Sequence, residues 1–190
     1  LVALAYLPQQ RLEGGVLQIA VIEGRLADVR VNNRSLVSDG RMQEFLAPIP
    51  RDQPPRQDAL DRQVLLLNDV PGVGSVQARL SPGSGVGETM LNIVTTEAKL
   101  AQGRVELDNH GGLYTGRNRL GASLQLNSPL GWGDRWSIAW LGSDADLSAA
   151  RLQGQLPLGG QGLSANMALG HTTYRLVDTF APLDARGASD

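Results

Sequence analysis

The chain has 190 residues, of which 42% are hydrophobic and 19% are charged, and its net charge at pH 7 is −2. The charged fraction is below the roughly 25% that is common in soluble domains, which indicates surface that faces something other than water. The near-neutral balance excludes the basic footprint of a nucleic-acid-binding protein, and the absence of cysteine excludes disulfides, thiolate metal sites and a cysteine nucleophile. No stretch of about 18 apolar residues occurs, so no transmembrane helix is predicted.

Residues 1–24 are predicted to form a β-hairpin. Val2, Leu4 and Tyr6 alternate with small residues in the first strand, a polar turn covers Pro8–Gly15, and a β-rich second strand runs over Val16–Val21. A two-stranded hairpin is marginal by itself. The chain has no initial Met and begins within the alternating pattern, so we expect the partner strands to precede the first residue.

Residues 25–98 are predicted to form a small α+β unit that begins with a strand over Leu26–Val31. Ser38-Asp39 is placed to cap a short helix over Gly40–Leu46. A Pro-rich loop separates this helix from a second one, which runs from about Arg56 to Asn68.

The second helix carries an apolar stripe. Leu60, Val64 and Leu67 recur at i, i+4 and i+7, and Leu65 and Leu66 widen the stripe. We interpret it first as core packing and second as one wall of a groove.

Two strands complete the unit. Ser75–Leu80 places Val76, Ala78 and Leu80 on one face, and Met90–Thr96 is the closing strand. The predicted order is therefore strand, helix, helix, strand, strand (β-α-α-β-β).

The pattern changes in residues 99–190, where helical periodicity disappears after Gly103. Segments of about 10 residues alternate apolar and polar side chains, as strands of a transmembrane β-barrel do. Trp132 and Trp136 lie close to a turn, which suits an aromatic belt at a membrane interface. The apolar positions of the five predicted strands are Val105, Leu107; Leu120, Ala122, Leu124, Leu126; Trp136, Ile138, Trp140; Ala150, Leu152, Leu156; and Leu163, Ala165, Met167, Leu169.

A soluble β-sandwich is the alternative for these strands, but soluble strands usually have about 5–6 residues. Five strands cannot close a barrel in lipid, because an open edge leaves backbone groups unpaired at several kcal/mol each. We therefore expect an incomplete barrel whose remaining strands follow Asp190.

No residue pattern predicts catalysis, a metal site or a cofactor. His110 and His171 have no second ligand at metal spacing, and Asp144 and Asp146 lack the rest of a calcium loop. The glycines within 83–87 are not followed by the Lys-Ser/Thr of a phosphate loop, so a hairpin turn is the better interpretation.

Several segments, in this order and spacing, resemble the outer-membrane transporters of two-partner secretion, the hemolysin/adhesin activation and secretion class. The resemblance covers nearly the whole chain. The segments that carry it are Ala5–Gln10, Gly15–Ile19, Val21–Gly24, Leu60–Arg62, Leu65–Val73, Leu80–Gly83, Val86–Leu91, Leu107–Gly111, Thr115–Arg117 and Leu130–Asp134.

The resemblance implies three parts. Residues 1–24 would be the last hairpin of a first POTRA (polypeptide-transport-associated) domain, and residues 25–98 a complete second POTRA domain. Residues 99–190 would be the N-terminal strands of a transmembrane β-barrel. The family's pore-inserting loop would lie well beyond this sequence, so no residue role is carried over from it.

The resemblance also implies a mechanism of type V secretion. POTRA domains in the periplasm would capture an unfolded exported partner by adding its extended segment as a strand to an exposed sheet edge. The partner would be a large adhesin, hemolysin or contact-dependent toxin, and lipid of the bacterial outer membrane would surround the barrel. The implied partner-binding residues, on the edge strand and the adjoining helix, are Ser75, Val76, Gln77, Ala78, Arg79, Leu80, Leu60 and Val64.

Two other functions stay open at this point. An outer-membrane barrel-assembly factor has the same parts but usually more POTRA domains upstream. A soluble adhesion or binding protein built of β-strands would appear in the periplasmic soluble fraction. None of the three functions predicts an enzyme, a cofactor or a nucleic-acid partner.

Overall fold

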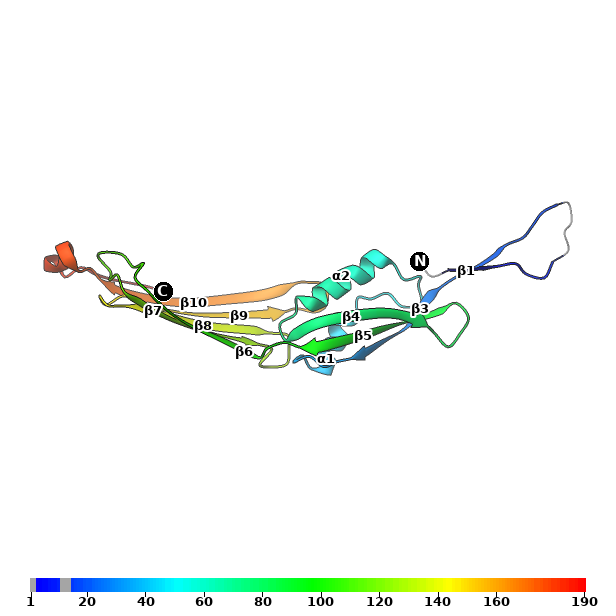
Figure 1. The fold of residues 1–190 in the computed structure, drawn as a ribbon, viewed down its shortest axis with the longest axis horizontal. Helices are drawn as coiled ribbons and strands as arrows, with labels where there is room; N and C mark the ends of the chain where they lie inside the picture. Colours follow the sequence, from blue (N-terminus) through cyan, green and yellow to red (C-terminus); the bar gives the residue numbers. More distant parts are fainter. Residues whose placement is uncertain (1–2, 11–14) are drawn as a thin grey trace.

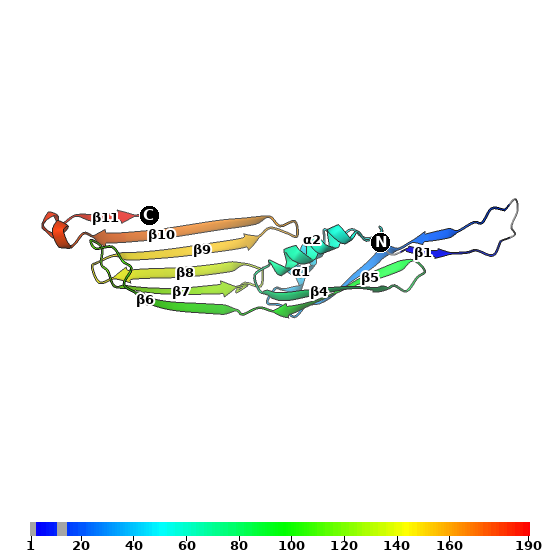
Figure 2. The same ribbon diagram turned by 45° about the horizontal axis from the view of Figure 1, so that its top comes forward.

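The computed structural model of the chain describes residues 3–10 and 15–190. It is an elongated molecule made mostly of β-sheet, with two α-helices near its middle (Figure 1). The strands form three separate sheets of two, three and six strands. A hairpin lies at one end, the helix-bearing unit follows, and the six-stranded sheet fans out at the other end (Figure 2).

The N-terminal hairpin pairs β1 (Ala3–Tyr6) with β2 (Ala20–Glu23) in antiparallel register. The predicted turn over Pro8–Gly15 lies partly outside the described residues. The second strand begins later than the predicted Val16, because the side-chain amide of Gln10 takes the place of a strand partner. Its Oε1 accepts the backbone N–H of Gln18 and its Nε2 donates to the Gln18 carbonyl, both at 2.8 Å.

The helix-bearing unit has the order strand, helix, helix, strand, strand. Its sheet has the order β3-β5-β4, in which β3 runs parallel to β5 and β4 runs antiparallel to it. The elements are β3 (Arg25–Asn32), α1 (Asp39–Leu46), α2 (Gln57–Asn68), β4 (Val73–Pro82) and β5 (Glu88–Glu97).

The first helix begins at the expected place but without the expected side-chain cap. Ser38 is the N-cap residue in extended conformation, yet its side chain makes no capping hydrogen bond. The backbone N–H of Ser38 instead donates to the carbonyl of Gly131, at 2.8 Å, in the turn after β7. The residue that starts α1 therefore also fastens the unit to the large sheet.

The core of the molecule lies in this unit, between the helices and one face of the three-stranded sheet. Strands, helices and connecting loops all contribute apolar side chains that are almost fully buried, which supplies most of the favourable free energy of folding. The buried apolar residues are Leu26, Val29, Val37, Met42, Phe45, Leu46, Ile49, Leu67, Val70, Val73, Leu91 and Ile93.

An ion pair fastens the first residues of the two parallel strands. Arg25 of β3 donates to Glu88 of β5 at 2.8 Å. The Arg25 guanidinium lowers the pKa of the Glu88 carboxyl, and the backbone N–H of Gly85 lowers it further. The charged form of Glu88 is thus favoured in the folded protein.

The large sheet is a continuous antiparallel meander in the order β11-β10-β9-β8-β7-β6. Five strands were predicted; the sixth, β11, was missed because its sequence Arg-Gly-Ala-Ser is polar and lacks apolar alternation. Within the described residues β6 and β11 are not paired with each other. The elements are β6 (Ala101–Asp108), β7 (Arg119–Asn127), β8 (Arg135–Ser143), β9 (Ser148–Pro157), β10 (Ser164–Arg175), the 3-10 helix η1 (Asp178–Leu183) and β11 (Arg186–Ser189).

Candidate functional site

The predicted binding strand lies at an edge of the three-stranded sheet. Ser75–Leu80 forms the middle of β4, and β5 is its one strand neighbour among the described residues. The backbone groups of β4 that face away from β5 therefore have no strand partner in this part of the chain. Such an edge is a template for pairing with another chain.

Two hydrogen bonds establish which residues of β4 turn their backbone groups outward. The N–H of Gly83, just after β4, donates to the carbonyl of Glu88 at 2.8 Å and so faces β5. The N–H of Val76 donates to the side-chain Oδ1 of Asn68 in α2 at 3.0 Å and so faces away. Because peptide groups alternate along a strand, Ala78 and Leu80 also face outward. The N–H of Val76, one of the implied partner-binding residues, is therefore already occupied by Asn68.

The side chains of β4 differ between its two faces. Val76 is half-buried against the core, as expected of the helix-facing side. Ala78 and Leu80 lie on the same side but are exposed, Leu80 by 44%, so they do not join the core. Gln77 and Arg79 are exposed on the opposite face. The outward-facing part of the edge thus combines an apolar side with a polar side.

The adjoining helix α2 buries a narrower stripe than its sequence suggests. Leu67 is buried, and Leu60 and Val64 are half-buried, with Leu60 packed against the core. Leu65 is 66% exposed, so the expectation that it widens the stripe is wrong. Gln63 occupies the buried face instead, with 5% exposure.

Gln63 joins the two halves of the molecule. Its Nε2 donates to the carbonyl of Phe45 at 2.6 Å and to the carbonyl of Gly160 at 3.0 Å, so both of its amide protons are used. Gly160 lies in the turn between β9 and β10, and a Cβ there would clash with the Phe45 carbonyl. This glycine therefore permits the close approach on which the Gln63 bridge depends.

Two arginines from the helices bind the same turn. Arg41 of α1 donates to the carbonyl of Pro157 at 2.8 Å, and Arg62 of α2 donates to the carbonyl of Gln161 at 3.3 Å. Hydrogen bonds to charged donors are the stronger kind. Together with Gln63, these side chains hold the β9–β10 turn against both helices.

The turn between β7 and β8 is organised by a buried carboxylate. Asp134 is 1% exposed. Its Oδ2 accepts the indole N–H of Trp136 at 2.8 Å and its Oδ1 accepts the backbone N–H of Trp132 at 3.3 Å. No residue pattern predicts this role, because the partners are recognisable only once the turn is formed.

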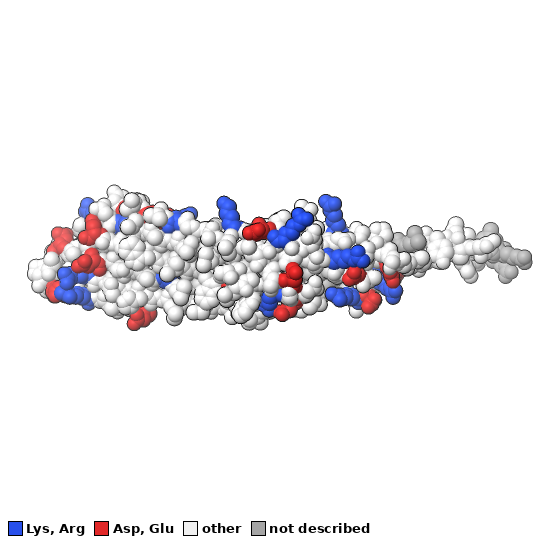
Figure 3. Space-filling model, turned by 90° about the horizontal axis from the view of Figure 1, so that it is seen from below, with Lys and Arg blue, Asp and Glu red and all other residues white. Residues whose placement is uncertain are grey.

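The six-stranded sheet has one apolar and one mostly polar face, as the alternation predicts. Cross-strand neighbours share a face, and Leu124 lies between Gly103 and Ile138 among apolar side chains. Figure 3 shows few charged side chains along the middle of the sheet. The apolar face contains Ala101, Val105, Leu107, Leu120, Ala122, Leu124, Leu126, Trp136, Ile138, Trp140, Ala150, Leu152, Met167 and Leu169. The polar side chains of the other face include Gln102, Arg104, Glu106, Ser123, Gln125, Ser137, Arg151, Gln153, Gln155 and Asn166.

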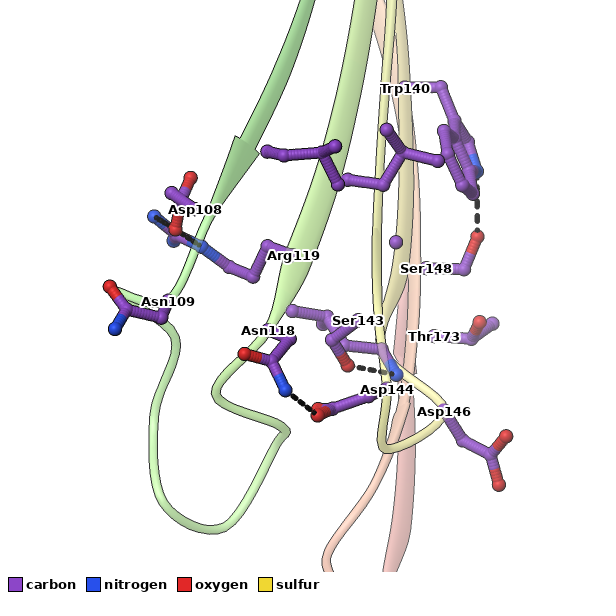
Figure 4. A pocket seen from close by; sticks show the side chains of 14 residues that line it. Asp108, Asn109, Asn118, Arg119, Trp140, Ser143, Asp144, Asp146, Ser148 and Thr173 are labelled. Atoms are coloured by element: carbon purple, nitrogen blue, oxygen red, sulfur yellow. Dashed lines mark hydrogen bonds and ion pairs between the residues drawn. The ribbon is translucent and has the colours of Figure 1, made fainter.

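A hollow lies at the end of this sheet that is distant from the helices (Figure 4). Its carboxylates are already paired: Arg119 donates to Asp108 at 2.9 Å, and Asn118 donates to Asp144 at 2.7 Å. Across residues 3–10 and 15–190, no group of three or more acidic, His or Cys side chains could hold a metal ion. The hollow is thus lined by the ends of strands and by the loops that join them, and its polar side chains are tied to one another.

Two of the loops at that end are also joined by an aromatic contact. Tyr114 and Phe180 meet edge to face, with ring centroids 4.9 Å apart. The N–H of Val177 donates to the Tyr114 carbonyl at 2.9 Å. These contacts tie the loop after β6 to the loop that contains η1.

No helix in the described parts of the chain is long and apolar enough to cross a membrane.

The family model of the haemolysin secretion/activation proteins ShlB/FhaC/HecB matches residues 87–189 of this chain. Among individual proteins, the heme/hemopexin transporter protein HuxB of Haemophilus influenzae (strain 86-028NP) is 33% identical, over 100% of this chain and 34% of HuxB. The outer membrane transporter CdiB of Escherichia coli O6:K15:H31 is 30% identical, over 96% of this chain and 30% of CdiB. The chain spans about a third of the length of these relatives.

Solved structures with a similar fold include the same kinds of protein. CdiB from Escherichia coli superimposes with a TM-score of 0.64 at 24% identity, covering 92% of this chain and 36% of CdiB. BamA from Haemophilus ducreyi lacking POTRA domains 1–3 gives 0.59 at 14% identity, covering 92% of this chain and 33% of BamA. At these identities the likeness concerns the fold.

Proposed function

Because this chain belongs to the family of haemolysin secretion/activation proteins ShlB, FhaC and HecB, we propose that the whole protein is a translocator of two-partner, type V secretion. It would capture an unfolded partner in the periplasm and release it through a β-barrel pore. The chain itself is an outer-membrane component, as its relatives named outer membrane transporters are.

The three sheets are proposed to correspond to three functional parts. The helix-bearing unit, with its order β3-α1-α2-β4-β5, is a POTRA domain over residues 25–98. The hairpin within residues 1–24 is the last one of a preceding POTRA domain, and residues 99–190 are the N-terminal strands of the transmembrane barrel. Support for the barrel comes from the apolar face of the six strands, which suits lipid, and from the polar face, which suits a water-filled lumen.

The observation that carries the proposal is the open edge of β4. Its outward-facing amides offer main-chain hydrogen bonds to an extended segment without requiring one sequence. Leu80 lies exposed beside them, as an apolar contact for alternate side chains of the partner. The same unit continues through residues 98–100 directly into β6. A captured segment would thus lie next to the sheet that forms the pore.

The partner is proposed to be a large exported protein, of the adhesin, hemolysin or contact-dependent toxin class, bound as an extended segment. The proposed activity is the passage of this polypeptide through the pore, and the proposal requires no covalent step, cofactor or metal. Direction would come from folding of the partner outside the cell, which withdraws unfolded chain from the pore.

The proposal is tested by deleting the gene for the full-length protein in its host and comparing the secreted proteins and the outer-membrane proteins. A two-partner translocator predicts that one large exported protein disappears from the medium, while other outer-membrane barrels keep their normal amounts. A general fall in outer-membrane barrels would contradict the proposal and support a barrel-assembly factor.

The role of the edge is tested by restoring the deletion strain with Ala78→Pro or Ala78→Thr. The proline removes an outward N–H but no bond to β5, so we expect secretion to fall while the amount of inserted protein stays the same. The threonine keeps the N–H and favours the strand, so secretion should match that of the wild type. Equal secretion by both variants would place capture elsewhere.

A further inference from the structure

We propose that Asn68 and Pro82 bound the capture edge of β4, so that the incoming chain meets two amide donors, those of Ala78 and Leu80. The inference rests on the function proposed above for β4. It adds where the edge begins and ends, and it assigns to Asn68 the role of a positioning residue that fixes where a captured segment lies.

Asn68 is held in place by two hydrogen bonds from opposite ends of one amide group. Its Nδ2 donates to the carbonyl of Val64, one turn earlier in α2, at 3.0 Å. Its Oδ1 accepts the outward N–H of Val76 at 3.0 Å. The side chain thus occupies the position that a carbonyl of an added strand would take, and it closes the edge on the side near the large sheet.

Pro82 ends the row of outward donors at the other end of the edge, because it has no N–H. It lies six residues after Val76 in the same outward phase and is the last residue of β4. Proline has no N–H to donate to a strand ladder. Immediately beyond it, the N–H of Gly83 turns inward to Glu88 and the chain enters the β4–β5 turn.

Between these two ends the strand presents two unoccupied outward donors, at Ala78 and Leu80, in the part of the chain that the structure describes. One net backbone hydrogen bond changes a binding equilibrium by about fivefold. The carbonyls of Ala78 and Leu80 face the same way and add two acceptors, so a segment held by these few bonds binds briefly and is released. This behaviour suits a protein that must pass a long chain onward rather than retain it.

The side chains beside the two donors define the chemistry of the segment. Side chains of an added strand alternate between the two faces of the sheet. One set would lie beside Leu80, which is exposed and apolar, and the other beside Gln77 and Arg79, which are polar. The edge therefore fits an extended peptide in which apolar and polar residues alternate.

The test uses the full-length protein in detergent and a short capped peptide of alternating Val and Thr as the probe. Hydrogen exchange of β4 is followed at single amides, with and without the peptide. In the wild type without peptide, the Val76 amide should exchange about fivefold or more slowly than in the Asn68→Ala variant. The peptide should then protect Ala78 and Leu80 and leave Val76 unchanged.

Three variants test the two ends of the capture edge. Asn68→Ala should remove the protection of Val76 in the free protein, and the peptide should then protect Val76 as well. Asn68→Asp keeps an oxygen acceptor at the same place, so Val76 should stay protected. Pro82→Ala adds a donor at the other end, where the peptide should give a new protected amide.

The outcomes separate the boundary from the capture function. If Val76 exchanges equally in the wild type and in Asn68→Ala, or if the variants leave the peptide footprint unchanged, the boundary is refuted while capture by β4 stands. If the peptide protects neither Ala78 nor Leu80 in any variant, capture by β4 is refuted. The proposed bounds of the capture edge are then refuted too, even where the protection of Val76 still depends on Asn68.

Discussion

The helix-bearing unit and the six-stranded sheet obtain order from the same alternation of apolar and polar residues, but they use it differently. In the unit, apolar side chains of β3 and β5, with Val73 and Val76 of β4, pack with those of the helices and form a closed core. In the large sheet, the apolar face has no protein layer over it in the described residues, and its Val105, Ile138 and Leu169 are exposed. The unit thus carries its own apolar environment, whereas the sheet requires one from outside, as a lipid-facing sheet does.

The largest expected effect concerns the closed core. Leu67→Ala empties a position that is 1% exposed, and we expect a loss of about 2–5 kcal/mol in the free energy of unfolding of the unit. Leu65→Ala, two positions away on the same helix and exposed, should change it by less than about 0.5 kcal/mol. Proteolysis of the full-length protein at increasing urea measures both. Equal losses would mean that α2 packs through a different face.

The next effect concerns the open face of the sheet. Leu124→Arg should cost roughly 2–4 kcal/mol when the full-length protein folds into lipid vesicles, because the charge would lie in hydrocarbon. The adjacent Gln125→Arg places the same charge among polar neighbours, Gln102 and Ser137, and should be nearly neutral. Urea titration in vesicles measures both. A larger cost for Gln125→Arg would mean that Gln125 faces the lipid and Leu124 faces the lumen.

A smaller effect is expected where the two regions meet. Gln63→Ala leaves the buried carbonyls of Phe45 and Gly160 without their donor, at about 1–3 kcal/mol. Hydrogen exchange in the turn after β9 should accelerate, while the exposed Gln57→Ala at the start of α2 should not change it. Unchanged exchange in Gln63→Ala would show that the arginines alone hold the turn.

The smallest effect is a dependence of stability on pH at the end of the three-stranded sheet that is distant from the large sheet. The pKa of Glu88 is lowered in the folded protein, so its ion pair with Arg25 stabilises the unit above the ordinary carboxyl pKa. This contribution is lost as the pH falls through the lowered pKa. Glu88→Gln should therefore lower stability at neutral pH and flatten the decline toward about pH 3. Urea denaturation of the full-length protein at a series of pH values measures this, and an unchanged decline in Glu88→Gln would contradict the role of the ion pair.

The sequence predicted elements better than it predicted contacts between them. Both helices and the strands β3 to β10 lie close to their predicted places, since apolar spacing and prolines define them locally. The edge position of β4 also agrees with the expectation that the family resemblance supplied. Asn68, Gln63 and Asp134 were missed, because each is polar and acquires its role from a backbone group that folding brings near. Leu65 was misplaced because a helical stripe does not reveal how far the partner surface extends.

The direct passage from β5 to β6 has a mechanical consequence. β5 is the central strand of its sheet, paired with β3 on one side and β4 on the other, and residues 98–100 connect it to the first strand of the large sheet. A tension along this axis would load both ladders of β5 in shear, so that many hydrogen bonds resist at once instead of opening one by one. The helix-bearing unit is thereby built to stay folded when its connection to the large sheet is pulled.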